Sequence, residues 1–129
     1  MGGLLLIQLN YRDSKPIYEQ IKEGLRRLVV TGALSVGEKL PSVRELASQL
    51  AINPNTIQRA YRELENEGYI YTLVGKGTFV AENDNIDNTR EKELLRDFDE
   101  LVTELLYLKV SKSTLKERID TVTEGSEKV

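Results

Sequence analysis

The fold is decided by residues 40–80, which read LPSVRELASQLAINPNTIQRAYRELENEGYIYTLVGKGTFV. Within them, Ser42 stands three residues before Glu45, which is the spacing of a capping box, where the hydroxyl and the carboxylate satisfy the free amides of a helix start. Asn53 is a second helix cap, and Pro54 suits the first helical position after it. The stretch therefore predicts two short helices in succession, joined by a tight turn.

Apolar residues recur at the helical period on both segments. On the first segment, the residues expected to be buried are Val43, Leu46, Ala47 and Leu50. On the second, they are Ile57, Ala60, Tyr61 and Leu64, and Gly68 ends the helix in a left-handed cap. Residues 69–72 and 78–80 are rich in aromatic and β-branched side chains, and the glycines between them predict a hairpin.

A further helix is predicted upstream, because Pro16 precedes a run of apolar residues on one helical face and Gly32 follows it. These apolar residues are Ile17, Ile21, Leu25, Leu28 and Val29. We expect residues 35–41 to form a loop. Residues 4–9 fit either a short strand or an N-terminal arm that packs on a partner.

A polar stretch rich in turn-forming residues, 81–88, is typical of a linker. The charge balance changes across it: residues 1–83 carry 10 basic and 9 acidic side chains, whereas residues 84–129 carry 8 and 12. We therefore expect two domains with different tasks, residues 1–81 and residues 82–129.

The second domain is predicted to be a helical hairpin. Its first helix carries a broad apolar stripe made of Leu94, Leu95, Phe98, Leu101, Val102, Leu105, Leu106 and Leu108. Ser111 and Ser113 begin a shorter helix with Leu115, Ile119 and Val122, and residues 124–129 are expected to fray. The predicted fold class is α+β, mainly α, with an N-terminal winged helix-turn-helix followed by a C-terminal two-helix dimerisation hairpin.

The composition argues against several function classes. The 129 residues contain no cysteine and no histidine, so disulfides, thiolate nucleophiles, histidine-based catalysis and the usual zinc ligands are absent. The early apolar run 4–7 is far shorter than the ~20 residues of a membrane span and lacks an export signal. We expect a cytoplasmic protein that is not an enzyme and holds no metal or cofactor.

The outward face of the helix predicted over residues 54–67 carries hydrogen-bonding groups, and no carboxylate precedes Glu63. The outward residues are Asn55, Thr56, Gln58, Arg59 and Arg62. A helix fits the major groove of DNA, where such groups meet donors and acceptors on the base edges. A solvated face that binds nothing is the alternative, although such a face would usually include acidic residues early.

Two flanking features fit the same partner. Arg44 can reach a phosphate or a base edge from the start of the preceding helix, or it can pair with a nearby acid such as Glu45 or Glu38. Gly75 and Gly77 permit close approach of the hairpin to a sugar-phosphate backbone, and Lys76 adds a positive charge. A plain hairpin turn explains the two glycines equally well.

Taken together, residues 7–80 resemble the GntR-type transcription regulators, specifically the short YtrA-like branch. The resemblance rests on the stretch quoted above and on the residues that lead into it, 16–42, which read PIYEQIKEGLRRLVVTGALSVGEKLPS. It implies a bacterial repressor that binds double-stranded operator DNA as a homodimer, and it implies control of a nearby transport operon.

The resemblance also implies which positions hold the DNA. They are Arg44, the outer face of the recognition helix with Asn55, Thr56, Gln58 and Arg59, and a wing glycine that is Gly75 or Gly77. Pro54 and Gln58 differ from the Ser or Arg that is frequent in the wider family, although they fit the YtrA-like branch. Gln58 is chemically suited to adenine, whereas Arg would favour guanine.

The apolar stripe over residues 94–108 is broader than the shorter helix that follows it can cover. We therefore expect it to pack against a second copy, because a symmetric dimer reads two half-sites; packing onto the winged domain is the alternative. A small-molecule effector at the dimer interface stays open, since the hairpin alone is too small for a pocket of roughly 300 to 1,000 Å³.

Two other function classes are alternatives for this sequence. One is a winged-helix module that binds protein rather than DNA. The other is an enzyme, because some GntR-type relatives fuse this head to an aminotransferase-like body that binds pyridoxal phosphate. The 46 residues after position 83 cannot hold such a body.

Overall fold

The computed structural model describes residues 7–82 and 88–127 of the chain. The chain divides into two compact units, residues 1–87 and 88–129. Residues 83–87, which make up most of the predicted linker, lie outside the described residues. The domain boundary predicted after residue 81 lies just before them. No described helix combines the length and the apolar character needed to cross a membrane.

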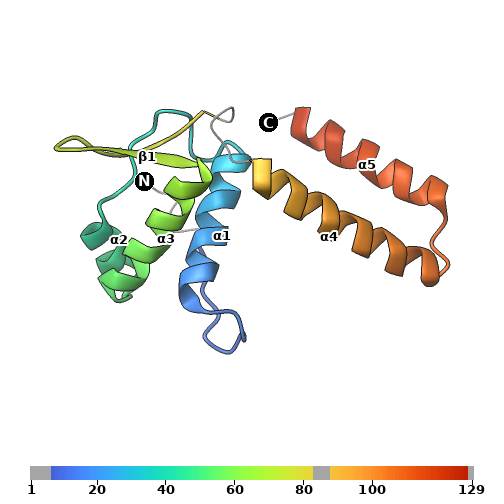
Figure 1. The fold of residues 1–129 in the computed structure, drawn as a ribbon, viewed down its shortest axis with the longest axis horizontal. Coiled ribbons are helices and arrows are strands. Elements are labelled where there is room, and N and C mark those ends of the chain that lie inside the picture. Colours follow the sequence, from blue (N-terminus) through green and yellow to red (C-terminus); the bar gives the residue numbers. More distant parts are fainter. Residues whose placement is uncertain (1–6, 83–87, 128–129) are drawn as a thin grey trace. The chain divides into compact units, whose positions relative to one another are not determined.

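The first unit contains three helices and a hairpin (Figure 1). The helices are α1 (Ile17–Val30), α2 (Val43–Leu50) and α3 (Pro54–Glu67), and the antiparallel strands are β1 (Ile70–Leu73) and β2 (Gly77–Val80). Both α1 and α2 pack against α3, and β1 follows directly from its end. The predicted winged helix-turn-helix is confirmed.

The core of this unit lies between the three helices and the hairpin. Its fully buried large side chains are Ile21, Leu25, Leu46, Ile57, Leu64, Ile70 and Val80. All apolar positions predicted for α3 are buried, and the remaining predicted positions of α1 and α2 are buried or packed against the core. The periodicity of the sequence therefore identified the inward faces correctly.

Local signals fixed where the helices begin and end. In the capping box of α2, the Glu45 amide donates to Ser42 Oγ at 3.1 Å and the Ser42 amide donates to Glu45 Oε1 at 3.3 Å. At the start of α3, the side chain of Asn53 accepts a hydrogen bond from the amide of Asn55. Gly68 ends α3 with φ 91°, as its left-handed cap requires.

Two expectations for the first unit need correction. The segment 35–41 is more than a loop, because Lys39 forms an isolated bridge with Phe79 and the amide of Leu40 donates to the carbonyl oxygen of Thr78. Residues 7–9 form no strand, and Ile7 is buried against the core of its own chain. Residues 1–6, which hold the rest of that expected strand or arm, lie outside the described part.

The second unit is a helical hairpin of α4 (Asn88–Tyr107) and α5 (Lys112–Glu127). The amide of Thr114 donates to Ser111 Oγ, so Ser111 serves the start of α5 as predicted. The expected fraying from residue 124 is wrong as far as Glu127, where α5 ends. Residues 124–127 lack apolar side chains, but they contain no proline, and helix propagation adds a backbone hydrogen bond for each further residue.

Candidate nucleic-acid interface

Three of the predicted contact residues form one exposed strip along α3. Asn55, Gln58 and Arg62 are spaced by three and four residues, which places them on one face of the helix, and all three are exposed. Within the described ranges, no hydrogen bond or ion pair engages their side-chain polar atoms. Amide and guanidinium groups in this state are free to meet base edges.

Arg59 lies at the border of this strip and is held differently. Its Cζ atom stands 3.6 Å from the ring centroid of Tyr18 on α1, in a cation–π contact. Its Nε donates to Glu63 Oε2 at 3.2 Å. Thr56, one turn earlier, is half-buried. Of the five predicted positions on α3, the structure thus leaves three side chains unengaged, shields Thr56 in part and ties Arg59 to α1.

A row of alternating charges continues from this point between α1 and α3. Lys22 Nζ contacts Glu63 at 2.9 Å and also pairs with Glu67, which accepts a hydrogen bond from Arg26 at 2.7 Å. The hydrogen bond from Lys22 lowers the pKa of Glu63 below its usual range. Burial pulls the pKa of Lys22 down, but the hydrogen bonds to Glu67 and Glu63 outweigh it and leave that pKa raised.

Arg44 occupies the second position of α2 and is exposed. Neither alternative pair of Arg44 is seen among the described residues: Glu45 accepts a hydrogen bond from the amide of Ser42, and Glu38 accepts one from the amide of Ser35. The segment leading into α2 is fixed to α3 by the buried hydroxyl of Tyr61, which donates to the carbonyl oxygen of Pro41 at 2.8 Å. Burial raises the pKa of Tyr61, so this hydroxyl stays protonated at neutral pH.

The hairpin of β1 and β2 is the wing of the winged helix-turn-helix, and its tip contains two glycines with positive φ. Gly75 has φ 80° and Gly77 has φ 121°, and Lys76 between them is exposed. A Cβ atom on Gly77 would lie 2.7 Å from Cε of Lys39, so the side chain of Lys39 crosses this part of the wing. Sequence reasoning missed Lys39, because its position follows from a bridge to Phe79 and not from a local pattern.

A second missed residue joins the wing to α3. The carboxylate of Glu65 accepts hydrogen bonds from the backbone amide of Thr72 at 3.3 Å and from its hydroxyl at 3.0 Å. The same hydroxyl lies 3.1 Å from that of Thr78 on the neighbouring strand. Glu65 therefore fixes β1 and β2 relative to the helix that carries the candidate contacts.

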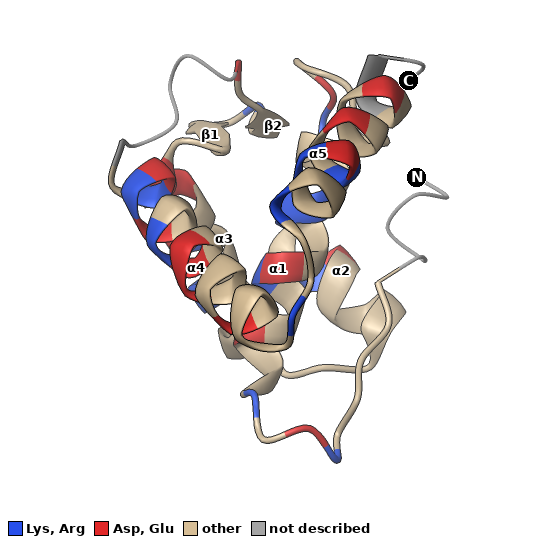
Figure 2. Cartoon of the chain, turned by 90° about the vertical axis from the view of Figure 1, so that its right-hand side faces the viewer, with Lys and Arg blue, Asp and Glu red and all other residues tan. Residues whose placement is uncertain are grey.

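The second unit leaves its apolar stripe uncovered. Of the eight predicted residues, Val102 is half-buried, and the other seven range from 36% exposed at Leu105 to 64% at Leu108. The apolar residues Ile119 and Val122 of α5 are also exposed. Basic residues gather in the early turns of α4 and α5, and acidic residues predominate further along both helices (Figure 2). Within the second unit, α5 therefore leaves the apolar stripe exposed.

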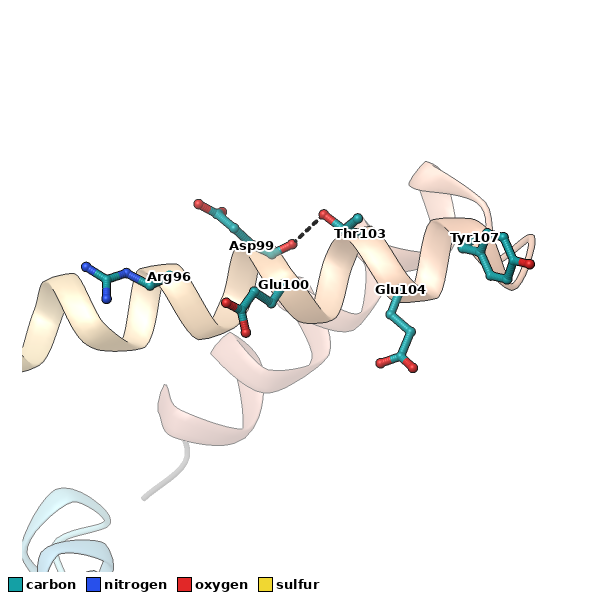
Figure 3. A pocket seen from close by; sticks show the side chains of 6 residues that line it. All are labelled: Arg96, Asp99, Glu100, Thr103, Glu104 and Tyr107. Atoms are coloured by element: carbon teal, nitrogen blue, oxygen red, sulfur yellow. Dashed lines mark hydrogen bonds between the residues drawn. The ribbon is translucent and has the colours of Figure 1, made fainter.

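Two surface hollows are candidate effector sites, and both are open to solvent. One, of about 490 Å³, is lined only by polar-face residues of α4 and by Tyr107, as Figure 3 shows. The other, of about 640 Å³, lies on the first unit beside Gln20 and Arg27. In the part of the chain that the structure describes, no three histidine, cysteine or carboxylate groups come close enough to hold a metal ion.

Comparison with known proteins matches residues 17–80 to the family described as "Bacterial regulatory proteins, gntR family". The chain is 43% identical over 116 residues to the uncharacterized HTH-type transcriptional regulator YhcF of Bacillus subtilis, with 89% of this chain and 96% of YhcF covered. It is 53% identical over 78 residues to the transcriptional repressor YtrA of the same organism, with 60% of each chain covered.

A solved complex with DNA is also similar. It is the DNA-binding domain of AraR with its operator ORE1, which matches with a TM-score of 0.51 and 32% identity over 57% of this chain and 90% of that one.

Proposed function

Because this chain belongs to the gntR family of bacterial regulatory proteins, we propose that it is a sequence-specific DNA-binding transcription repressor that acts as a homodimer on an inverted-repeat operator. The observation that carries the proposal is the exposed strip of Asn55, Gln58 and Arg62 on α3. These side chains offer donors and acceptors that no described residue uses.

DNA is the partner that this surface fits. The strip supplies amide and guanidinium groups for the major groove, and Arg44 adds a further cation from the adjoining helix. The wing presents Lys76 and, across Gly77, Lys39, which are suited to phosphates. The complex of AraR with its operator supports this assignment through a similar winged unit.

Repression is the direction of control that we propose. YtrA, to which the first unit is similar, is named a transcriptional repressor. Both relatives reported above are named as transcriptional regulators. We propose no catalytic role for the chain.

The apolar stripe of the second unit supports the proposal of a homodimer. Leu101 is 60% exposed and Phe98 46%, and burial of such side chains stabilises an interface by about 1.5–3 kcal/mol each when it is complete. The stripe lies on the opposite side of α4 from the polar face drawn in Figure 3. Two copies that pack their apolar stripes together bring two α3 helices to one duplex, which gives the specificity that a single short helix lacks.

Selection of bound duplexes from a random pool tests the proposal. The wild-type protein should enrich one sequence that contains two half-sites in inverted orientation. Replacement of Gln58 and Arg62 by alanine should remove the enrichment, while replacement of the exposed Arg12 and Gln49 should leave it intact. A wild-type protein that enriches no duplex at physiological salt would contradict DNA recognition and favour a protein-binding winged helix.

A further inference from the structure

Tyr18 and Arg59 form a contact that no local sequence pattern predicts. Tyr18 is the second residue of α1 and is half-buried, and its ring face lies under the guanidinium of Arg59 at 3.6 Å from the centroid. The hydroxyl of Tyr18 is engaged elsewhere, since it donates to Glu19 Oε1 at 3.2 Å. The ring face, and not the hydroxyl, is therefore the group that meets Arg59.

The contacts of Arg59 leave a defined part of it available. Glu63 accepts a hydrogen bond from Nε at 3.2 Å, and the ring of Tyr18 covers one face of the planar group. The two terminal nitrogens have no hydrogen-bond partner among the described residues, and the side chain is 56% exposed. What remains free is a pair of parallel N–H donors, which matches the geometry of a bidentate acceptor.

Glu63 is itself held in place, so it can hold Arg59. Lys22, whose side chain is only 17% exposed, contacts Glu63 at 2.9 Å and is fixed by Glu67 on its other side. Arg59 is thus restrained from two directions, by an aromatic face from α1 and by a carboxylate that α1 also anchors. An arginine ordered in advance loses less side-chain entropy when it binds.

Arg59 stands four residues after Asn55 and three before Arg62, at the edge of the exposed strip of α3. We propose that Tyr18 is a positioning residue for base-specific recognition, which holds the guanidinium of Arg59 so that its free N–H pair meets the O6 and N7 acceptors of a guanine. This inference rests on the proposed DNA-binding function. It assigns to α1 a role in specificity that does not require Tyr18 to touch DNA.

The test measures discrimination at single base pairs. The operator enriched by the wild-type protein is changed one base pair at a time, and the affinity of each duplex is measured for the wild type and for the variants Arg59→Ala, Tyr18→Leu and Tyr18→Phe. We expect Arg59→Ala to abolish the preference for guanine at one position of each half-site. Tyr18→Leu should lower the preference at that same position about 3- to 10-fold, whereas Tyr18→Phe, which keeps the ring face, should change it less than about 2-fold.

Two further variants separate positioning from direct contact. The double variant Tyr18→Leu with Arg59→Ala should behave as Arg59→Ala alone, because the ring acts through the arginine. Tyr11→Leu, at an exposed tyrosine of the same unit, is the matched control and should leave the preference unchanged. Glu63→Gln should reduce discrimination at the same position while the ring of Tyr18 stays in place. It replaces Tyr18→Leu in the test if a measurement of the melting temperature shows that Tyr18→Leu does not fold.

Several results would overturn the inference. An equal loss on all duplexes in Tyr18→Leu would assign Tyr18 or Arg59 to a phosphate, and tighter binding would mean that the ring holds Arg59 away from DNA. Tyr18→Phe matching Tyr18→Leu would indicate a hydroxyl contact, and unchanged discrimination in Glu63→Gln, or a loss in Tyr11→Leu, would also contradict it. A wild type that enriches no duplex overturns the proposed function itself, and the inference with it.

Discussion

At the scale of single residues, the arginines of the winged unit differ in what surrounds them. Arg44 and Arg62 are exposed and have no partner within the described residues, whereas Arg26 lies 5.4 Å from the ring centroid of Tyr69 and pairs with Glu67. Arg59 is intermediate, because it is exposed and yet restrained. These differences predict different contributions to affinity.

Replacement of Arg44 by alanine should lower the affinity for the selected operator by ~1–3 kcal/mol if the side chain reaches a base edge. The loss should depend on the base at one position and disappear when that base is changed. Fluorescence anisotropy with labelled duplexes measures it, and Arg12→Ala, at another exposed arginine of the unit, is the control. Equal affinities for Arg44→Ala and the control would remove Arg44 from the interface.

Lys76→Ala should weaken DNA binding whatever the base sequence of the duplex, because we expect the ammonium group on the wing to contact phosphates. Affinity for all duplexes should fall, and the slope of log K against log salt should shrink by roughly one unit as one counterion fewer is released. Titrations at several salt concentrations measure the slope. An unchanged slope would mean that Lys76 contacts no phosphate.

Sequence patterns found the strip of Asn55, Gln58 and Arg62, because helical spacing alone decides which residues share a face. They did not find the contact of Tyr18 with Arg59, which joins residues 41 positions apart through the packing of α1 on α3. Which of the outward arginines is free and which is restrained follows from tertiary packing. No local period encodes such a distinction.

At the scale of elements, helix caps and glycines determine where α3 and the wing begin and end. Ser42 and Asn53 begin the two helices of the motif, and Gly68 turns the chain directly into β1. Those signals are local, and they could be read from the sequence. The bridge of Lys39 to Phe79 could not, since it depends on where the wing folds back in space.

Gly77→Ala should destabilise the first unit by about 1–3 kcal/mol, because φ 121° is a region open essentially to glycine and the new Cβ would meet Lys39. Gly75→Ala is the matched comparison, with φ 80° and no atom near the added Cβ, and it should cost less. Urea unfolding of both variants measures the difference. Equal losses would mean that the crossing of Lys39 over the wing contributes nothing.

The charge row between α1 and α3 predicts a dependence of stability on pH. The pKa of Glu63 is lowered in the folded state, so its contribution is present above its unfolded pKa and is lost as pH falls through the folded pKa. Glu63→Gln should be less stable than the wild type at neutral pH, and the gap should close between about pH 5 and pH 3. Unfolding curves over this range measure the gap, and a constant gap would contradict the linkage.

At the scale of the whole molecule, the two units suggest a division of labour between reading DNA and joining two chains. The amphipathic pattern of α4 predicted an apolar stripe correctly, because periodicity shows which residues share a face. The breadth of the stripe also predicted a second copy as its cover, and this stays a prediction. The exposure of Leu101, Leu106 and Leu108 within the second unit is consistent with it.

The most direct test of the account is sedimentation of the protein with its selected operator. We predict a free species of two 14.6 kDa chains and a complex of two chains on one duplex. Changing Leu101 and Leu105 to Asp should give monomers that bind the operator weakly, while Thr103→Asp on the polar face should remain a dimer. A wild-type protein that is monomeric in solution and binds an asymmetric site as one chain per duplex would contradict the account.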